Sequence, residues 1–262
     1  MSDEVLYEKD GFTACVTLNR PEQRNAVSGR LHRQLSERLA EAEADPEVRA
    51  VILTARGPMF CAGIDFQGSL QQGVAAPAAS ALRMELRDAP PSLLYRMATP
   101  TICALNGGAA GFGMDLALAC DLRIAGASAR LAAGYVKTGV GPPESGGTWL
   151  LPRLVGFARA AEILFTGRKL DAPELLALGL VSRVVPDAEL LPEARKLAGE
   201  IAANAPLAVQ AAKRMLRAGE REGFEDHVQR LYLQVMHLMK TQDCAEGVKA
   251  FLEKRPPRFE GR

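Results

Sequence analysis

One carboxylate occupies an unusual setting in residues 141–147, which read GPPESGG. Glu144 stands between a Pro-Pro pair and a Ser-Gly-Gly run, just before the apolar helix start TWLLPRLVG. This position has an ordinary explanation, because the helix dipole stabilises a carboxylate near the N-terminus of a helix. A carboxylate can also act as the general base that takes a proton from a substrate. The motif alone leaves both interpretations open.

Two glycine-rich turns form a second group of candidate site residues. FCAGID (60–65) follows the apolar run AVILT, and NGGAAGFGMDLALACD (106–121) follows the apolar run TICAL. Neither turn has the glycine spacing of a nucleotide-binding loop. Glycine and alanine could simply permit tight strand-to-helix turns. If the turns face each other, however, the unpaired main-chain N–H groups at the two helix starts can hold one oxyanion.

The acid/base candidates near these turns are mostly carboxylates. The ionisable residues there are Asp65, Asp115, Asp121, Lys137 and Glu144. We expect His32 and His227 on the surface because their neighbours are charged, and we expect His237 to be packed beside an apolar stripe. Ser145 lacks the flanking glycines of a nucleophile elbow, so a serine–histidine triad is not indicated.

The composition excludes several classes of partner. The chain has 262 residues, with 32 basic and 31 acidic side chains and 5% aromatic residues. A net charge of +1 provides no basic field for nucleic acid. No apolar run approaches the roughly 18–20 residues that cross a bilayer, and the acidic start MSDEVLYEKDG lacks a signal core. We therefore expect neither a nucleic-acid nor a membrane partner.

The cysteines indicate a reducing compartment. There are five, they are widely spaced, and no two form a C-x-x-C pair. This pattern suggests neither a disulfide framework nor a zinc site. We expect a cytoplasmic protein with no metal and no redox cofactor.

The elements that position the candidate residues follow an α/β order. Strands are expected at 12–18, 50–54, 101–105 and 121–125, with helices at 28–45 and 114–120. Ser28 is the expected N-cap of the first helix, whose apolar face is formed by Leu31, Leu35, Leu39 and Ala42. Strands that alternate with helices favour parallel pairing. The fold class is therefore α/β.

The remaining segments are less regular or helical. Residues 66–90 have weak periodicity, which indicates a loop or a loosely held helix. From residue 157 onward the chain is nearly all helix, interrupted by a short strand at 180–185. Leu231, Val235, Leu238 and Met239 share one helical face, which is typical of a core or of a subunit interface.

Five blocks of sequence together resemble one known family. They are NRPEQRNA, AVILT with GPMFCAGIDF, ICALNGGAAGFGMDLALACDLRIA, GGTWLLPRLVG and EGVKAFLEKRPPRF. Their order and extent resemble the crotonase superfamily, which contains the enoyl-CoA hydratases and isomerases. The fourth block and the tail most resemble the ring-type enoyl-CoA isomerases of aromatic-acid degradation.

The resemblance implies a fold and an assembly. The crotonase fold is a spiral of ββα units, expected here over residues 1–195 together with the acyl-CoA site. Residues 196–262 would form a helical C-terminal oligomerisation region that completes the CoA site. The family assembles as trimers, often paired into hexamers, so a homotrimer or hexamer is expected.

The resemblance also implies the site residues. In the family, two main-chain N–H groups bind the oxygen of the acyl-CoA thioester, and by motif position these belong to Ile64 and Phe112. The positions that line the CoA site are Arg24, Ala26, Ala62, Asp65 and Gly111. Coenzyme A would enter as part of the substrate, with no separate cofactor.

Two positions depart from the two-glutamate pattern of the family's hydratases, and a third residue matches another acidic position. Asp115 takes the place of the first glutamate and is one methylene shorter. The second glutamate falls at or next to Tyr135, where this chain has no carboxylate. Glu144 matches an acidic position that several isomerases and some C–C hydrolases of the superfamily carry, allowing for one extra residue.

These departures favour a double-bond shift, in which Glu144 transfers a proton and Asp115 acts as a second acid/base residue or only orients water or the substrate. Three alternatives stay open. They are hydration of an enoyl-CoA by Asp115 and Glu144, C–C hydrolysis of a β-diketone, and a non-catalytic acyl-CoA-binding subunit.

Overall fold

A six-stranded sheet forms the centre of the molecule. The computed structural model describes residues 3–65, 89–139, 141 and 145–262. The strand order is β1-β2-β3-β5-β7-β10. β1 and β2 pair antiparallel, and all later neighbours pair parallel, as the sequence predicts. The strands are β1 (Val5–Asp10), β2 (Thr13–Leu18), β3 (Ala50–Ala55), β5 (Thr101–Leu105), β7 (Leu122–Gly126) and β10 (Arg183–Val185).

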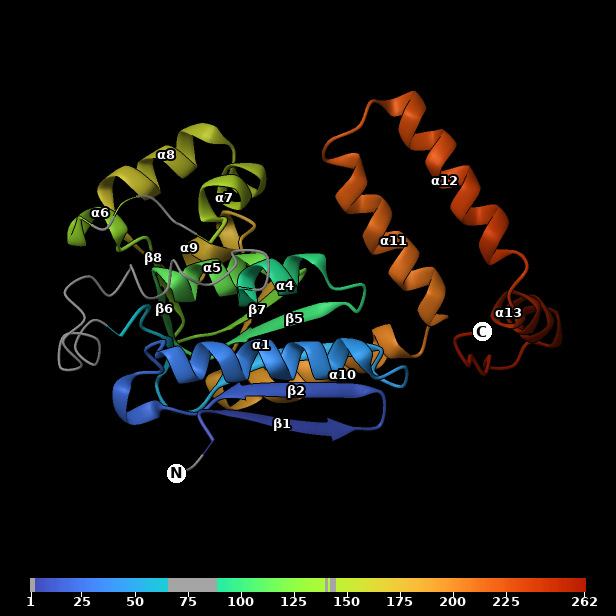
Figure 1. Cartoon of the computed structure of the whole chain (residues 1–262), viewed down its shortest axis with the longest axis horizontal. Helices are drawn as coiled ribbons and strands as arrows, with labels where there is room; N and C mark the ends of the chain where they lie inside the picture. The colour runs from blue at the N-terminus through green and yellow to red at the C-terminus, as the bar shows by residue number, and fades with distance from the viewer. Residues whose placement is uncertain (1–2, 66–88, 140, 142–144) are drawn as a thin grey trace.

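Helices cover both faces of this sheet (Figure 1). α1 (Gly29–Ala44) packs on one face, and the Ser28 side chain accepts a hydrogen bond from the Leu31 amide, so the expected cap is confirmed. α10 (Leu190–Ala202) packs on the other face, where Ile52 and Ile102 belong to the same apolar cluster as its buried residues. Successive residues of β3 therefore face different cores, which explains its unbroken apolar sequence.

A second, smaller sheet positions the glycine-rich turns. Its order is β4-β6-β8-β9, with β8 antiparallel to β9 and the other pairs parallel. The strands are β4 (Met59–Cys61), β6 (Gly108–Ala110), β8 (Arg130–Ala132) and β9 (Lys169–Asp171). Three residues are too few to show a strand periodicity, so this sheet is not predictable from the sequence pattern. Two sheets with intervening helices agree with the expected spiral.

The other helices lie around the small sheet or form the C-terminal part. Two short 3₁₀ helices span Pro21–Gln23 and Asp187–Glu189. The α-helices near the small sheet are α4 (Pro90–Arg96), α5 (Phe112–Ala119), α6 (Tyr135–Thr138), α7 (Gly147–Val155), α8 (Phe157–Thr166) and α9 (Ala172–Ala177). The C-terminal helices are α11 (Pro206–Gly219), α12 (Phe224–Leu238) and α13 (Gln242–Glu253).

The C-terminal helices extend to one side of the sheet (Figure 1). The expected boundary at 195/196 falls within α10, and α10 packs on the sheet. The helices that leave the sheet therefore begin with α11. No residue of α12 is buried in the single chain, and the stripe residues Leu231 and Val235 are each 41% exposed. This face is therefore not packed on the core of the single chain.

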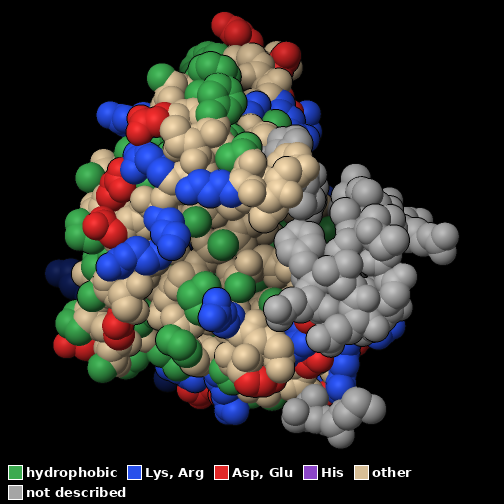
Figure 2. Space-filling view, turned by 90° about the vertical axis from the view of Figure 1, so that its left-hand side faces the viewer, with side chains coloured by type: hydrophobic (Ala, Val, Ile, Leu, Met, Phe, Trp, Pro, Cys, Tyr) green, Lys and Arg blue, Asp and Glu red, His purple; other side chains and the backbone are tan. Residues whose placement is uncertain are grey.

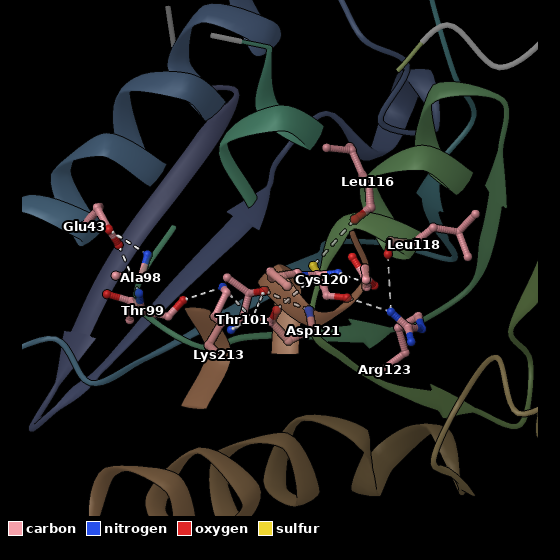
Figure 3. Close-up of polar contacts among 12 residues, drawn as sticks. Glu43, Ala98, Thr99, Thr101, Leu116, Leu118, Cys120, Asp121, Arg123 and Lys213 are labelled. Carbon is pink, nitrogen blue, oxygen red and sulfur yellow. Dashed lines mark hydrogen bonds and ion pairs between the residues drawn. The ribbon is translucent and has the colours of Figure 1, made fainter. Parts of the chain in front are cut away.

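A buried ion pair holds α11 against the end of α5 (Figure 3). Lys213 Nζ lies 2.6 Å from an Asp121 oxygen and donates a hydrogen bond to the Thr99 carbonyl at 2.9 Å. The same Asp121 oxygen accepts from the amide and the hydroxyl of Thr101, and Arg217 pairs with the other oxygen at 3.0 Å. Asp121 is thus a structural residue that joins α11 to the sheet, and it follows the C-terminal end of α5, whereas the glycine residues of the second turn lie at the start of that helix.

The visible surface carries no field of one sign. On the face shown in Figure 2, lysine and arginine side chains are interspersed with acidic and hydrophobic ones.

The expected 66–90 loop lies outside the described residues, apart from Ala89 and Pro90 at the start of α4. No helix in the part of the chain that the structure describes is long and apolar enough to cross a membrane.

Candidate functional site

The two glycine-rich turns are in direct contact. β4 pairs with β6, with Cys61 opposite Ala109, and both strands run into their turns side by side. A Cβ atom added to Gly63 would lie 3.0 Å from the Ala110 carbonyl oxygen and 3.7 Å from the Phe112 nitrogen. A Cβ atom added to Gly113 would lie 2.7 Å from Cys61 Cβ. Only glycine permits this approach, so the two turns face each other, which is the condition for holding one oxyanion between them.

Each turn has a main-chain N–H group at this contact. Val27 donates to the Gly63 carbonyl at 2.8 Å and accepts from the Asp65 amide at 3.1 Å, so the Ile64 amide between them points away from Val27. Phe112 is the first residue of α5, where an amide has no partner within its own helix. Among the described residues, neither amide donates to a main-chain acceptor. Both are therefore available to an oxygen atom.

Hydrogen bonds hold the turn at 19–26 against the first glycine-rich turn. Arg24 and Asn25 both have φ of 54°. The Arg24 carbonyl accepts from the Ala62 amide at 3.1 Å, and buried Asn25 donates to the carbonyls of Arg56 and Met59. The Arg24 side chain is exposed. Four expected CoA-site residues, Arg24, Ala26, Ala62 and Asp65, thus lie on two segments that hydrogen bonds join.

Asp65 forms an ion pair with Arg20, for which the sequence carries no signal. Both terminal nitrogens of Arg20 lie 3.1 Å from one Asp65 oxygen, and Arg20 also donates to the Ala26 carbonyl at 2.7 Å. Both side chains are largely buried. Asp65 therefore fixes the turn at 19–26 through Arg20. A lone arginine after a strand gives no signal of such a role.

Asp115 and Tyr135 form a buried hydrogen-bonded pair beside the second turn. Asp115 is fully buried and lies in the first turn of α5. Its Oδ2 atom accepts from the Tyr135 hydroxyl at 2.6 Å and from the Ser145 amide at 3.2 Å. Tyr135 occupies the position where the resemblance leads one to look for a carboxylate. The bond to Asp115 has no signal in the sequence.

The expected base, Glu144, lies outside the described residues. Ser145, the residue that follows it in the chain, donates its amide to Asp115. Lys137, another candidate, is an exposed residue of α6. The part of the chain that the structure describes contains no group of three His, Cys, Asp or Glu side chains that could hold a metal ion.

The three histidines differ in part from their expected positions. His32 is buried, at 6% exposure, and its ring centroid lies 5.8 Å from that of Phe112. The expectation of a surface residue is wrong because residues 32, 35 and 39 share one helix face, a spacing that outweighs the charged neighbours. His237 is exposed in the single chain and His227 is half-buried, so the expected packing of His237 is also wrong here.

The burial of His32 predicts a specific loss of stability in acid. Burial lowers the pKa of His32 to about 4, below the value of about 6.5 in the unfolded chain. The contribution of neutral His32 to the stability of the folded state is therefore complete above pH 6.5 and is lost as the pH falls towards 4. Between pH 7 and pH 4.5 the free energy of unfolding should fall by about 2 kcal/mol more in the wild type than in His32→Leu. Urea unfolding of both proteins at the two pH values measures this difference. His237→Gln is the control, and equal pH dependence in His32→Leu and wild type would contradict the prediction.

Comparisons with known proteins identify the family. A putative enoyl-CoA hydratase of Thermus thermophilus is 41% identical over 97% of this chain and 100% of its own. The 1,2-epoxyphenylacetyl-CoA isomerase of Escherichia coli is 35% identical over all of both chains. The crystal structure of an enoyl-CoA hydratase from Bacillus anthracis superposes with a TM-score of 0.93 at 34% identity, covering 99% of this chain and 100% of that one.

The family-level match extends over nearly the whole chain. The family described as Enoyl-CoA hydratase/isomerase matches residues 8–262. The fold expected from the resemblance is confirmed by the solved structures of that family, including its C-terminal helices. This chain belongs to the enoyl-CoA hydratase/isomerase family and has its crotonase fold.

Proposed function

We propose that this protein shifts a double bond in an acyl-CoA thioester through an enolate intermediate. The observation that carries the proposal is the contact of the two glycine-rich turns, in which Gly63 lies against Ala110 and Phe112. The contact leaves the amides of Ile64 and Phe112 without main-chain acceptors in the described part of the chain. The buried Asp115 carboxylate follows Phe112 by three residues in α5.

The two amides would bind the thioester oxygen. When a proton leaves the carbon next to the thioester, negative charge develops on that oxygen, and two N–H donors stabilise it. The amide of Phe112 lies at the N-terminus of α5, where the helix dipole favours negative charge. Removing one such donor typically costs about 10²–10³ in rate.

A carboxylate would move the proton. Glu144 is the candidate from its place in GPPESGG, and it would remove the proton from one carbon and return it to another. A correctly placed general base contributes about 10²–10⁴ in rate. Asp115 is the second candidate.

Coenzyme A would be bound as part of the substrate, with no separate cofactor. Arg24, Ala26, Ala62, Asp65 and Gly111 are the proposed CoA-site residues. The exposed guanidinium of Arg24 suits the phosphates of coenzyme A. The exposed apolar face of α12 supports assembly into a homotrimer or hexamer, which would cover it.

Hydration of a trans-2-enoyl-CoA is the second candidate function. It is favoured by the buried carboxylate of Asp115, which lies three residues after Phe112. The name of the Thermus thermophilus relative, a putative enoyl-CoA hydratase, also favours it. In this reaction Asp115 and Glu144 together would activate water and deliver a proton.

The two functions are separated by their substrates. The purified protein is given a 3-enoyl-CoA and, separately, crotonyl-CoA, and both reactions are followed by absorbance and by chromatography of the products. The proposal expects conversion of the first to the conjugated 2-enoyl-CoA at a rate at least tenfold above water addition to the second. Faster hydration would favour the second function, and no turnover of either would contradict both.

A further inference from the structure

We propose that Arg217 on α11 is a positioning residue for the Phe112 amide, because it takes part in two chains of contacts that lead to the two ends of α5. The inference rests on the proposed function, since it concerns an amide that would bind the thioester oxygen. It goes beyond that function because it gives a C-terminal helix a part in the geometry of the site.

The first contact lies at the C-terminal end of α5. A terminal nitrogen of Arg217 donates to one oxygen of Asp121 at 3.0 Å, and Lys213, one turn earlier on α11, lies 2.6 Å from the other oxygen (Figure 3). Thr101 donates both its amide and its hydroxyl to that second oxygen. Asp121 comes directly after Cys120, the C-cap of α5. The end of α5 is therefore tied to α11.

The second contact leads from Arg217 to α7. The guanidinium carbon of Arg217 lies 4.1 Å from the centre of the Tyr95 ring on α4, and the Tyr95 hydroxyl donates to Glu220 at 2.8 Å. The Tyr95 ring meets the Trp149 ring of α7 edge to face, with centroids 5.4 Å apart. Arg221, just after α11, lies 5.5 Å from the centre of the Trp149 ring. Aromatic and cation–π contacts therefore hold α7 against α4 and the end of α11.

α7 extends this contact to the first turn of α5. Trp149 lies in the first turn of α7, and Ser145 comes just before the N-cap of that helix. The Ser145 amide donates to Asp115 at 3.2 Å, in the same first turn of α5 that begins with Phe112. A helix of eight residues is about 12 Å long and behaves as a short rigid rod. Both ends of this rod are thus connected to Arg217.

These contacts are suited to fixing a geometry. Taking charges out of water costs much of what their attraction returns, so a buried ion pair contributes more to one arrangement of helices than to stability. Oxyanion donors need such an arrangement, because each must lie within about 2.7–3.1 Å of the oxygen. The Ile64 amide is held separately, by a bridge of Ile64 with Val27. Loss of Arg217 would therefore let α5 tilt and move the Phe112 amide relative to that of Ile64.

The test compares Arg217→Met and Tyr95→Leu with wild type. Methionine keeps an unbranched side chain and removes the charge and the donors. With a 3-enoyl-CoA, kcat should fall about tenfold, since a displacement of 1 Å costs on the order of 10² and a tilt moves the amide less. KM should change less than about twofold, because ground-state binding is retained. In the double variant the two losses should not multiply, because both residues belong to one network.

Fluorescence gives a second readout that a purely local effect would not change. Trp149 is the only tryptophan of the chain, and its ring lies against Tyr95. In Arg217→Met its emission should shift to longer wavelength, because a released Tyr95 ring leaves the indole more exposed to water. Tyr95→Phe keeps the ring and should keep both the emission and most of kcat, whereas Tyr95→Leu should lose both.

The matched control is Arg214→Met. It makes the same chemical change three residues earlier on α11, where the side chain donates to Gln234 of α12. Its kcat and its tryptophan emission should equal those of wild type. An equal loss of kcat in Arg214→Met would overturn the inference, because any weakening of α11 would then have the same effect as loss of Arg217.

The remaining outcomes are also decisive. A folded Arg217→Met protein with wild-type kcat, even with a lower melting temperature, makes Arg217 a structural residue and overturns the inference. If Arg217→Met does not fold, Arg221→Met decides, since its exposed side chain lies near Tyr95 and Trp149. A lower kcat at unchanged KM then supports the inference, and an unchanged kcat overturns it. Wild type without activity on either enoyl-CoA overturns the proposed function, and the inference with it, before any variant is compared.

Discussion

Glu144→Gln should lower kcat for double-bond migration by about 10²–10⁴, the usual contribution of a placed general base. Glutamine keeps the size and the hydrogen-bonding capacity of the side chain but cannot take up a proton. In the proposed function, the substrate is bound by the amides of Ile64 and Phe112 and by the CoA-site residues. KM should therefore stay within about threefold of wild type, since loss of a transition-state interaction lowers kcat without weakening ground-state binding. The measurement is initial rates with a 3-enoyl-CoA and with a trans-2-enoyl-CoA for both proteins.

The control is Glu200→Gln, which makes the same chemical change at an exposed position of α10 and should leave both rates unchanged. Full activity in Glu144→Gln would mean that the carboxylate in GPPESGG only stabilises its turn and the following helix. Loss of hydration together with migration would assign Glu144 to both reactions. Loss of hydration alone would favour the hydratase.

Most of the central sheet and its covering helices could be predicted because their signals are local, although the edge strand β1 was not expected. β3 and β5 are continuous apolar runs buried on both faces, and α1 has both a serine cap and an apolar face of helical spacing. The small sheet could not be predicted, since its strands have three residues each and exist only through pairing with distant segments. It is nevertheless this sheet that brings the glycine-rich turns together.

In the candidate site, too, the features with local sequence signals could be predicted and the contacts between distant residues could not. The turns themselves are visible in the sequence as glycine runs after apolar strands, and their contact follows once β4 and β6 pair. The bond from Tyr135 to Asp115 joins residues 20 positions apart on different elements, and the ion pair from Arg20 to Asp65 joins residues 45 apart. Nothing in the local pattern of any of these side chains marks a partner. Buried His32 was detectable from helix spacing, which a reading based on charged neighbours overlooked.

The C-terminal helices show where a single chain leaves an expectation unresolved. The apolar residues of α12 predict burial, and the single chain does not bury them. Their exposure is consistent with the assembly that the resemblance implies. α11 itself is held by the buried Lys213–Asp121 pair at the far end of α5, so the helix that carries Phe112 at its start is attached to the C-terminal helices at its end.

Gly113→Ala should separate the amides of Ile64 and Phe112, the proposed oxyanion donors, although the substitution adds only one methyl group. The new Cβ would lie 2.7 Å from Cys61 Cβ and 3.0 Å from the Cys61 carbonyl carbon, and neither atom can rotate away. The two turns would have to separate, which moves the Phe112 amide away from the Ile64 amide. A displacement of about 1 Å in such a site costs on the order of 10² in rate, and overpacking costs about 1–3 kcal/mol of stability.

The measurement is kcat for double-bond migration, together with urea unfolding to establish that the variant is folded at the assay temperature. Gly199→Ala is the matched control, because a Cβ there meets nothing within 4 Å and alanine favours the α10 helix; it should keep full activity and gain up to about 1 kcal/mol. A folded Gly113→Ala protein with wild-type kcat would show that the contact of the two turns does not govern the reaction. In that case the amides of Ile64 and Phe112 could not be the donors that stabilise the enolate.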